Sequence, residues 1–274
     1  MKSSFKKYYD SKVGIKEYSE LLKLQEPEKV ILKKIKSKIK GRKMLDIGIG
    51  AGRTTKFFAP LVKEYVGTDY SKGMLDISKE RFSNLPNASF KICDARAMRI
   101  FKDNSFDFIL FSFNGIDSVS YEDRDLILEE IKRVGKKNAI FCFSSHNLLN
   151  LVKGFTIIPP KTKFLRKIKL LITRKINLHI NESFEEIQKK SFAVIDLFVK
   201  GSLLSYACIT PLKQIEQLKE NSFKEIEAYS LKTGKKLNKR KLKDIKDCWV
   251  YYLCKIGGEK EKKIGKEKEK ENKK

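Results

Sequence analysis

The sequence predicts an α/β protein built on a mostly parallel sheet with helices on both faces. From residue 43 onward, short apolar runs alternate with stretches of helical pattern, and this alternation is typical of parallel sheets. The runs are apolar throughout rather than at every second residue, which indicates strands buried on both faces. The chain has 274 residues, 41% of them hydrophobic, which is enough to bury a core of this kind.

Seven strands are expected from these apolar runs. Five of them lie in the first part of the chain, at 44–47, 64–69, 89–93, 106–111 and 138–143. The helical stretches between them lie near 52–62, 71–84 and 121–134, and Ser71 is a suitable N-cap for the second. After a helix that begins at Pro211 come two further strands, 223–231 and 249–256. No long helix separates these last two strands, so we expect one of them to run antiparallel to the rest.

The chain divides into four segments by composition and pattern. Residues 1–42 are helical in pattern, and residues 43–146 together with 205–256 carry the sheet. Residues 147–204 interrupt the alternation, and within them 147–181 carries eight basic residues and no acid, with apolar residues at helical spacing. This pattern predicts a basic amphipathic helix. Residues 147–204 are therefore expected to be a helical insertion after the fifth strand that forms a substrate lid. Residues 257–274 alternate Lys and Glu and are expected to be disordered.

The strong positive charge by itself does not select a class of partner. The net charge is +26, but only ten of the 60 basic residues are Arg, the residue best suited to reading bases and phosphates. A solvated, Lys-rich surface explains the excess. The five cysteines are scattered, which favours reduced thiols in a cytoplasmic protein, and neither CxxC nor a His cluster predicts a metal site. No secretory signal and no membrane-spanning run is recognisable.

A glycine-rich turn follows the first predicted strand. It contains Gly48, Gly50 and Gly52, preceded by Asp46 at the strand end. Glycines there allow the backbone to approach a ligand closely. A dinucleotide fingerprint would need glycine at position 53, where Arg53 stands, and the Gly-Lys-Ser/Thr ending of a Walker loop is missing. The acid before the first glycine favours a ligand with a cationic end.

Two further carboxylates follow the next two predicted strands. Asp69 ends the second strand, where a carboxylate can accept hydrogen bonds from both hydroxyls of a ribose. Asp94 ends the third strand and is expected near the edge of a base. Because ligands bind at the carboxyl ends of parallel strands, these acids and the glycine turn together predict an adenosine-bearing ligand.

With these residues, the sequence resembles the class I S-adenosylmethionine-dependent methyltransferases, strongly over 43–145 and in outline over 205–256. The family motif D/E-x-G-x-G-x-G is matched in full by Asp46 and the three glycines. The resemblance implies a Rossmann-like sheet of seven strands and S-adenosyl-L-methionine as cofactor. It also implies that the glycine turn faces the methionine part, that Asp69 binds the ribose, and that Asp94, with Ala95 beside it, neighbours the adenine.

The family has no universal catalytic residue, so candidates come from position. His146 follows the fifth strand and is the candidate general base, unless it only orients a loop. Asp117 either serves the same role or caps a segment. Phe113 and Asn114 are expected to line the substrate pocket, and Tyr9 either closes over the cofactor or packs.

Several acceptors remain open. The motifs of DNA amino-methylating and pyrimidine-methylating enzymes are absent, which favours methyl transfer to an oxygen or nitrogen of a small metabolite or sugar. An RNA methyltransferase is the alternative, with phosphates bound by Lys161, Lys163, Arg166 and Lys167. The same basic helix would also suit an enzyme that acts at a membrane surface on a lipid or quinone. A fourth reading is a non-catalytic, cofactor-binding subunit.

Overall fold

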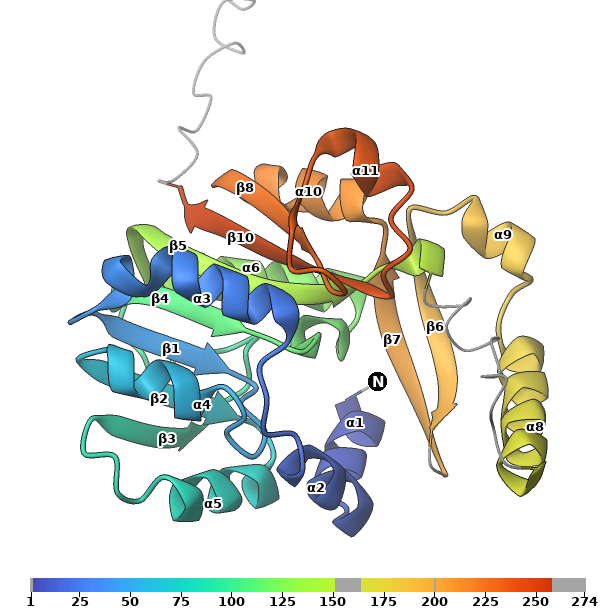
Figure 1. The fold of residues 1–274 in the computed structure, drawn as a ribbon, viewed down its shortest axis with the longest axis horizontal. Helices are drawn as coiled ribbons and strands as arrows, with labels where there is room; N and C mark the ends of the chain where they lie inside the picture. Colours follow the sequence, from blue (N-terminus) through green and yellow to red (C-terminus); the bar gives the residue numbers. More distant parts are fainter. Residues whose placement is uncertain (1, 151–163, 200, 258–274) are drawn as a thin grey trace, which may run out of the picture.

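The computed structural model describes residues 2–150, 164–199 and 201–257. Its centre is a sheet of eight strands in the order β3-β2-β1-β4-β5-β10-β8-β9, with helices on both faces (Figure 1). The strands of this sheet are β1 (Lys43–Ile47), β2 (Glu64–Asp69), β3 (Ala88–Ile92), β4 (Phe106–Phe111), β5 (Gly135–His146), β8 (Phe223–Ser230), β9 (Lys236–Leu237) and β10 (Trp249–Ile256).

Strand directions agree with the sequence prediction. Strands β1 to β5 pair in parallel, and β10 runs antiparallel to both of its neighbours, β5 and β8. The mostly parallel sheet with an antiparallel strand is thus confirmed. The eighth strand, β9, was not predicted: it is a two-residue edge strand that folds back on β8 through a turn at Gly234. A strand of two residues is too short to produce a recognisable apolar pattern.

Helices cover the sheet on two sides and divide the core into two layers. One layer packs α3 (Glu26–Ile39) and α4 (Thr55–Phe58) on the sheet, and the other packs α6 (Tyr121–Val134) and α10 (Pro211–Glu220). The remaining elements around the sheet are α5 (Lys72–Arg81), α11 (Lys239–Lys243) and the 3-10 turns η1 (Ala59–Leu61) and η2 (Gly115–Asp117). As expected, Ser71 is the N-cap of α5, accepting from the N–H of Met74.

Two short N-terminal helices lie at the carboxyl ends of the central strands (Figure 1). They are α1 (Lys2–Tyr9) and α2 (Lys12–Ser19). The Ser71 hydroxyl donates to the Asp10 carboxylate at 2.5 Å, which ties the turn between these helices to α5. Gly14 packs so closely on the Tyr8 carbonyl that a Cβ there would lie 2.2 Å from it. The N-terminal segment is therefore held in place over the end of the sheet where ligands bind in this class of fold.

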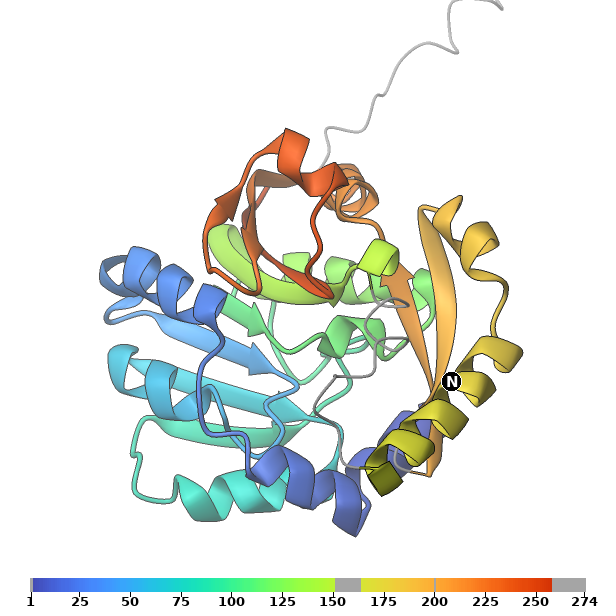
Figure 2. The same ribbon diagram turned by 45° about the vertical axis from the view of Figure 1, so that its right-hand side comes forward.

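The insertion after β5 is only partly helical. It contains α8 (Phe164–Ile180) and α9 (Phe184–Gln188), as expected, but β6 (Phe192–Val199) and β7 (Ser202–Ile209) form an antiparallel hairpin that was expected to be helical or core. Alternating burial along β6, with Ala193, Ile195 and Leu197 buried, is the period of a strand with one covered face. Figures 1 and 2 place α8 beside this hairpin, on the side away from the central sheet.

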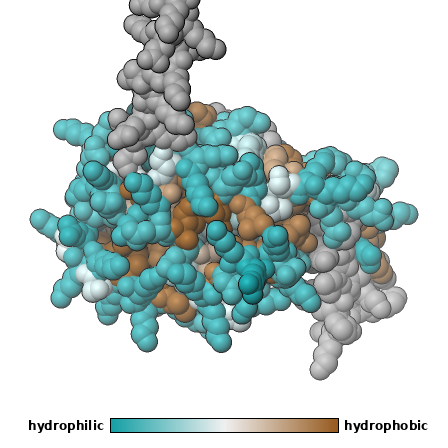
Figure 3. Space-filling view, turned by 90° about the horizontal axis from the view of Figure 1, so that it is seen from above, coloured by the Kyte–Doolittle hydropathy of each residue, from teal (hydrophilic) through white to brown (hydrophobic). Residues whose placement is uncertain are grey.

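Hydrophilic residues cover most of the molecular face in Figure 3, in agreement with a solvated, Lys-rich surface. Among the described helices, none combines the length and apolarity needed to cross a bilayer. The Lys/Glu tail predicted from residue 257 lies, apart from Gly257, outside the described residues.

Candidate functional site

The glycine loop (residues 48–52) follows β1 directly. Gly48, Gly50 and Gly52 have φ values of 65°, 56° and 81°, which residues with a Cβ rarely adopt. A Cβ on Gly52 would also lie 2.3 Å from the Phe82 ring, whereas one on Gly50 would meet only Tyr18, at 3.9 Å. The loop therefore needs glycines for its own shape, and its middle residue faces open space.

Asp69 ends β2 and lies against the glycine loop. Its Oδ2 accepts from the N–H of Gly50 and its Oδ1 from the N–H of Ser71, both at 2.9 Å. A carboxylate has about four lone-pair positions, so beside these two donors and the N–H of Tyr70 it can still accept from a ligand. Burial raises the pKa of Asp69 to about 6, partly opposed by these backbone hydrogen bonds. None of the described residues forms an ion pair with it.

Asp46 lies on β1 just before the glycine loop and is almost fully buried. Its Oδ2 accepts from the Thr54 hydroxyl at 2.6 Å and from the Tyr65 hydroxyl at 2.7 Å. Burial raises its pKa to about 7, although these two hydrogen bonds and the nearby Arg53 act in the opposite direction. Within the described part of the chain this carboxyl also has no ion-pair partner, so a ligand cation would stabilise its charged form.

Asp94 follows β3 and stands apart from these two acids. Its carboxylate is engaged by the guanidinium of Arg96, whose Nε donates to Oδ1 at 2.8 Å, and Arg96 also pairs with Asp123 at the start of α6. Asp94 lines a second pocket next to the one that holds Asp46 and Asp69, and Ala95 lines both. An adenine base bound in this second pocket would therefore contact an Asp94 that already pairs with Arg96.

The main pocket opens at the carboxyl ends of the parallel strands. The glycine loop, Asp46 and Asp69 form one side, and the residues that follow β4 form another. Tyr9, Tyr18 and Leu21 from the N-terminal segment close it. The acceptor positions of the two buried acids and the free space over Gly50 fit a ligand with a cationic end and a ribose, as S-adenosylmethionine has.

A strained corner follows β4 at the edge of this pocket. Phe113 and Asn114 are consecutive residues with φ values of 59° and 62°, and such a conformation in a bulky residue such as phenylalanine is unusual. The Asn114 N–H donates to the Ser144 hydroxyl at 2.8 Å, and the Phe113 ring lies 5.0 Å from the guanidinium carbon of Arg53. Strain of this kind persists where the surroundings hold it, and it gathers at functional sites.

Arg53 occupies the position where a dinucleotide fingerprint has its third glycine. It forms a buried, two-pronged ion pair with Glu28 of α3, with N–O distances of 2.5 Å and 2.7 Å. The Ser112 and Tyr251 hydroxyls also donate to Glu28. Arg53 therefore fastens α3 to the glycine loop and to the corner after β4.

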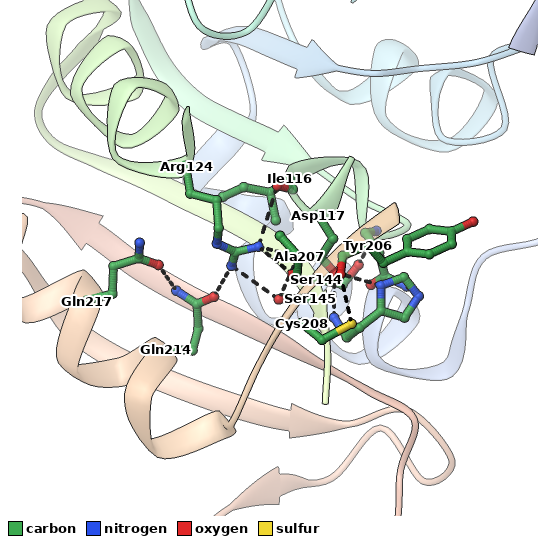
Figure 4. A network of polar contacts seen from close by, with 12 residues as sticks. Ile116, Asp117, Arg124, Ser144, Ser145, Tyr206, Ala207, Cys208, Gln214 and Gln217 are labelled. Atoms are coloured by element: carbon green, nitrogen blue, oxygen red, sulfur yellow. Dashed lines mark hydrogen bonds and ion pairs between the residues drawn. The ribbon is translucent and has the colours of Figure 1, made fainter. Parts of the chain in front are cut away.

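A second polar network lies under the end of β5 (Figure 4). Asp117 is fully buried, and its Oδ2 accepts from both the backbone N–H (2.6 Å) and the Nδ1 of His146 (2.8 Å). Its Oδ1 accepts from Ser145 at 2.8 Å and pairs with the guanidinium of Arg124. Burial alone would raise the pKa of Asp117, but the charge of Arg124 and the hydrogen bonds from His146 lower it below its ordinary value.

His146 is thereby held with one ring nitrogen toward Asp117. Its Nε2 is 3.2 Å from the Nδ2 of Asn114, so Nε2 accepts when Nδ1 carries the proton. Its ring makes edge contacts with Tyr206 of β7 (5.0 Å between centroids) and with Trp249 of β10 (5.9 Å). In this polar and aromatic surround, the Oδ1 of Asn114 and the Nε1 of Trp249 are buried without a hydrogen-bond partner among the described residues.

The expected site residues thus lie in three places. Asp46, Asp69, Ala95, Phe113 and Tyr9 line the main pocket together with Gly48 and Gly50, whereas Gly52 packs against Phe82 instead. His146, Asn114 and Asp117 form the adjoining network instead of lining this pocket, and Asp94 lines the neighbouring one. Asp117 has no position for direct proton transfer, because it is fully buried and both oxygens are occupied.

The sequence prediction did not include Glu28 or Arg124, although Arg124 carried a signal. Arg124 shares a helix face with Ile127, Leu128 and Ile131, at spacings of three, four and seven residues. A charged residue on an apolar face predicts a buried ion pair. Tyr206 and Trp249 carried no comparable signal, since their contacts with His146 depend on the hairpin and on strand order.

The remaining expectations concern partners and metals. Lys161 and Lys163 lie outside the described residues, and the side chains of Arg166 and Lys167 in α8 are not described either. In the part of the chain that the structure describes, no group of His, Cys, Asp or Glu is arranged to hold a metal ion.

Comparison with known proteins agrees with this geometry. Residues 44–138 match the family model described as a methyltransferase domain. A curated relative, the demethylmenaquinone methyltransferase of Staphylococcus aureus (strain JH9), is 36% identical over 101 residues, which cover 35% of this chain and 40% of that protein. The chain thus aligns with well under two thirds of the length of the curated relatives that it matches.

Solved structures share the fold over a longer range. An S-adenosylmethionine-dependent methyltransferase from Clostridium acetobutylicum superposes with a TM-score of 0.60 at 15% identity, covering 85% of this chain and 91% of that chain. A Haemonchus contortus phosphoethanolamine N-methyltransferase, solved with phosphomonomethylethanolamine and S-adenosylhomocysteine, gives 0.58 at 18% identity, covering 93% and 61%. At such identities the likeness concerns the fold. Residues 44–138 thus match a methyltransferase domain and contain the glycine motif, and the chain shares its fold with S-adenosylmethionine-dependent methyltransferases.

Proposed function

We propose that this protein transfers a methyl group from S-adenosylmethionine to an oxygen or nitrogen of a small molecule, with His146 as general base. The observation that carries the proposal is the His146–Asp117 pair at the end of β5, beside the Phe113–Asn114 corner that borders the cofactor pocket. A proton acceptor next to that pocket suits an acceptor atom that must lose a proton as it is methylated.

In this proposal the carboxyl ends of β1 and β2 hold the cofactor. Asp46 accepts from its ammonium group, Asp69 accepts from the ribose hydroxyls, and the glycine loop admits its methionine part. Tyr9 and Tyr18 of the N-terminal segment cover the pocket and exclude water from it. When bound, S-adenosylmethionine supplies a methyl group already activated by the sulfonium charge, so alignment and dryness are the main tasks of the protein.

The acceptor side in this proposal is formed by residues around His146. Asp117 fixes the ring so that Nε2 can take a proton. The acceptor group then takes the place of the Asn114 amide beside Nε2. Tyr206 and Trp249 supply apolar walls, which suits an acceptor with a ring or another flat apolar part.

A lipid-soluble quinone is the second candidate acceptor. It is favoured by the 36% identity with a demethylmenaquinone methyltransferase, although that match covers only about a third of this chain. Demethylated quinols therefore belong in the acceptor screen beside soluble metabolites.

The test is methyl transfer from isotopically labelled S-adenosylmethionine to separate panels of small phenols, amines, sugars, quinols and RNA. We expect label in at least one small-molecule panel, and expect His146→Ala to incorporate it much more slowly. Label found only in RNA would contradict the proposed acceptor class. Cofactor binding without transfer to any panel would favour the non-catalytic subunit.

Asp69→Ala is expected to weaken S-adenosylmethionine binding about tenfold to a hundredfold, since hydrogen bonds to a charged group contribute about 1.5–3 kcal/mol each. Calorimetric titration measures the change. Asp76→Ala is the matched control, because Asp76 is an exposed carboxylate on α5 that pairs only with Lys72 among the described residues. Equal affinities of the two variants would contradict the ribose assignment.

Cofactor affinity should also depend on pH. The pKa values of Asp46 and Asp69 are raised to about 7 and about 6, and both groups bind the cofactor in their charged form. Lowering the pH from about 7.5 to about 5.5 protonates them, so the dissociation constant should rise about tenfold to a hundredfold. Asp46→Asn should flatten most of this dependence. A wild-type affinity that is constant over this range would show that neither carboxylate must be ionised.

A further inference from the structure

The helix α8 is attached to the molecule through polar side chains. The Asn181 side chain bonds both the N–H (2.8 Å) and the carbonyl (2.7 Å) of Asp196 in β6, and the Asn177 Oδ1 accepts from the N–H of Phe198 at 2.8 Å. These asparagines satisfy the backbone of β6 on the edge that does not pair with β7. The attachment uses the polar side of the helix.

The large apolar side chains in the described part of α8, from Leu171 onward, are exposed to solvent. Ile172, Ile176 and Ile180 recur every fourth residue, which places them along one side of the helix. With two leucines of α8 and three side chains of the hairpin they form what we call the outer surface of the insertion: Leu171, Ile172, Ile176, Leu178, Ile180, Val194, Phe198 and Leu203. Each is between 36% and 56% exposed.

This exposure is concentrated. Of the fifteen large apolar side chains that are exposed in the described residues, these eight come from α8 and from the two strands of the neighbouring hairpin. Scattered exposed apolar residues need no explanation, but a concentration on one part of the surface indicates an interaction site.

The charge around this surface is positive. Residues 147–181 contain no acid, and Arg174 and Lys175 are exposed on α8 itself. Of the acids that follow the helix, Glu182 and Glu186 are paired with Lys190 and Lys189, and Glu185 is exposed. The single acid in the strands of the hairpin is the half-buried Asp196. Exposed aliphatic side chains beside basic groups that have no acidic partner among the described residues are the combination that binds the headgroup region of an anionic bilayer.

We propose that the outer surface of the insertion docks this protein on an anionic lipid bilayer. The opposite face of the hairpin carries Tyr206, which contacts His146, and Leu204, which packs with Phe5 and Tyr8 of α1. Docking therefore puts the bilayer on one side of a two-stranded layer and the His146 site on the other. This goes beyond the proposed methyl transfer and does not depend on it.

The test is flotation of the full chain with phosphatidylcholine vesicles that contain either no anionic lipid or about 30% phosphatidylglycerol. We expect stronger binding to the anionic vesicles. The triple variant Ile172→Ser, Ile176→Ser, Ile180→Ser should lose this binding about tenfold or more, since buried apolar area sets the affinity of such helices. Serine and isoleucine have similar helix propensities, so α8 should persist.

The matched control is Val30→Ser, Ile100→Ser, Leu126→Ser, which removes three apolar side chains outside the insertion that are at least as exposed on average. It should bind vesicles as the wild type does, and both variants should keep S-adenosylmethionine affinity. Absence of wild-type binding, or equal binding by the two variants, would overturn the proposal. So would a wild-type dimer in light scattering that the α8 variant alone dissociates, because a second copy would then cover this surface.

Discussion

Arg124→Met is expected to lower the free energy of unfolding by about 3–5 kcal/mol, the usual cost of leaving a buried charge without its partner. Arg124 and Asp117 are both fully buried and form an ion pair. The same guanidinium donates to the Ala207 carbonyl of β7 and to Gln214 of α10 (Figure 4). Methionine fills a similar volume but leaves the Asp117 carboxylate with only the donors of Ser145 and His146. Urea denaturation measures the loss.

The double variant Asp117→Asn, Arg124→Met separates the charge from the packing. It removes both buried charges, so we expect it to be more stable than Arg124→Met alone. The difference between wild type and Arg124→Met should also narrow as the pH falls toward about 5, because an unpaired, buried Asp117 takes up a proton there. A loss below about 1 kcal/mol at neutral pH would mean that the ion pair does not stabilise the fold.

The sheet and its ligand-binding edge could be predicted because local pattern determines them. The apolar runs gave β2, β4 and β10 with boundaries that differ from the structure by no more than a residue, and the glycine motif marked the loop after β1. Helices with one apolar face, such as α6, could be predicted equally well. Each of these features depends on residues that lie close together in the sequence.

The hairpin and the His146 surround could not be predicted in the same way. The apolar alternation of β6 lies within residues 147–204, which are expected to form a helical insertion, although the turn glycine Gly201, at a φ of 87°, marks a reversal of the chain. The contact between His146 and Tyr206 joins residues 60 positions apart across an insertion. Such contacts depend on how the insertion docks, which no local pattern records.

His146→Ala is expected to lower the rate of methyl transfer to the acceptor found in the screen by about 10²–10⁴-fold, the range of a lost general base. The pair with Asp117 leaves Nε2 as the acceptor nitrogen. Affinity for S-adenosylmethionine should stay within about twofold of the wild type, because His146 lies outside the residues that line the cofactor pocket. Single-turnover rates and calorimetry measure the two quantities separately.

Added imidazole should partly restore the rate of His146→Ala, since it can occupy the vacated space and accept the proton. His146→Gln is the structural comparison: glutamine keeps a hydrogen bond to Asp117 but offers no basic nitrogen. Asp117→Asn should also slow transfer, because an amide no longer fixes the ring with its proton on Nδ1. If His146→Gln turns over as fast as the wild type, the histidine only orients the loop after β5, and the sulfonium alone drives the reaction.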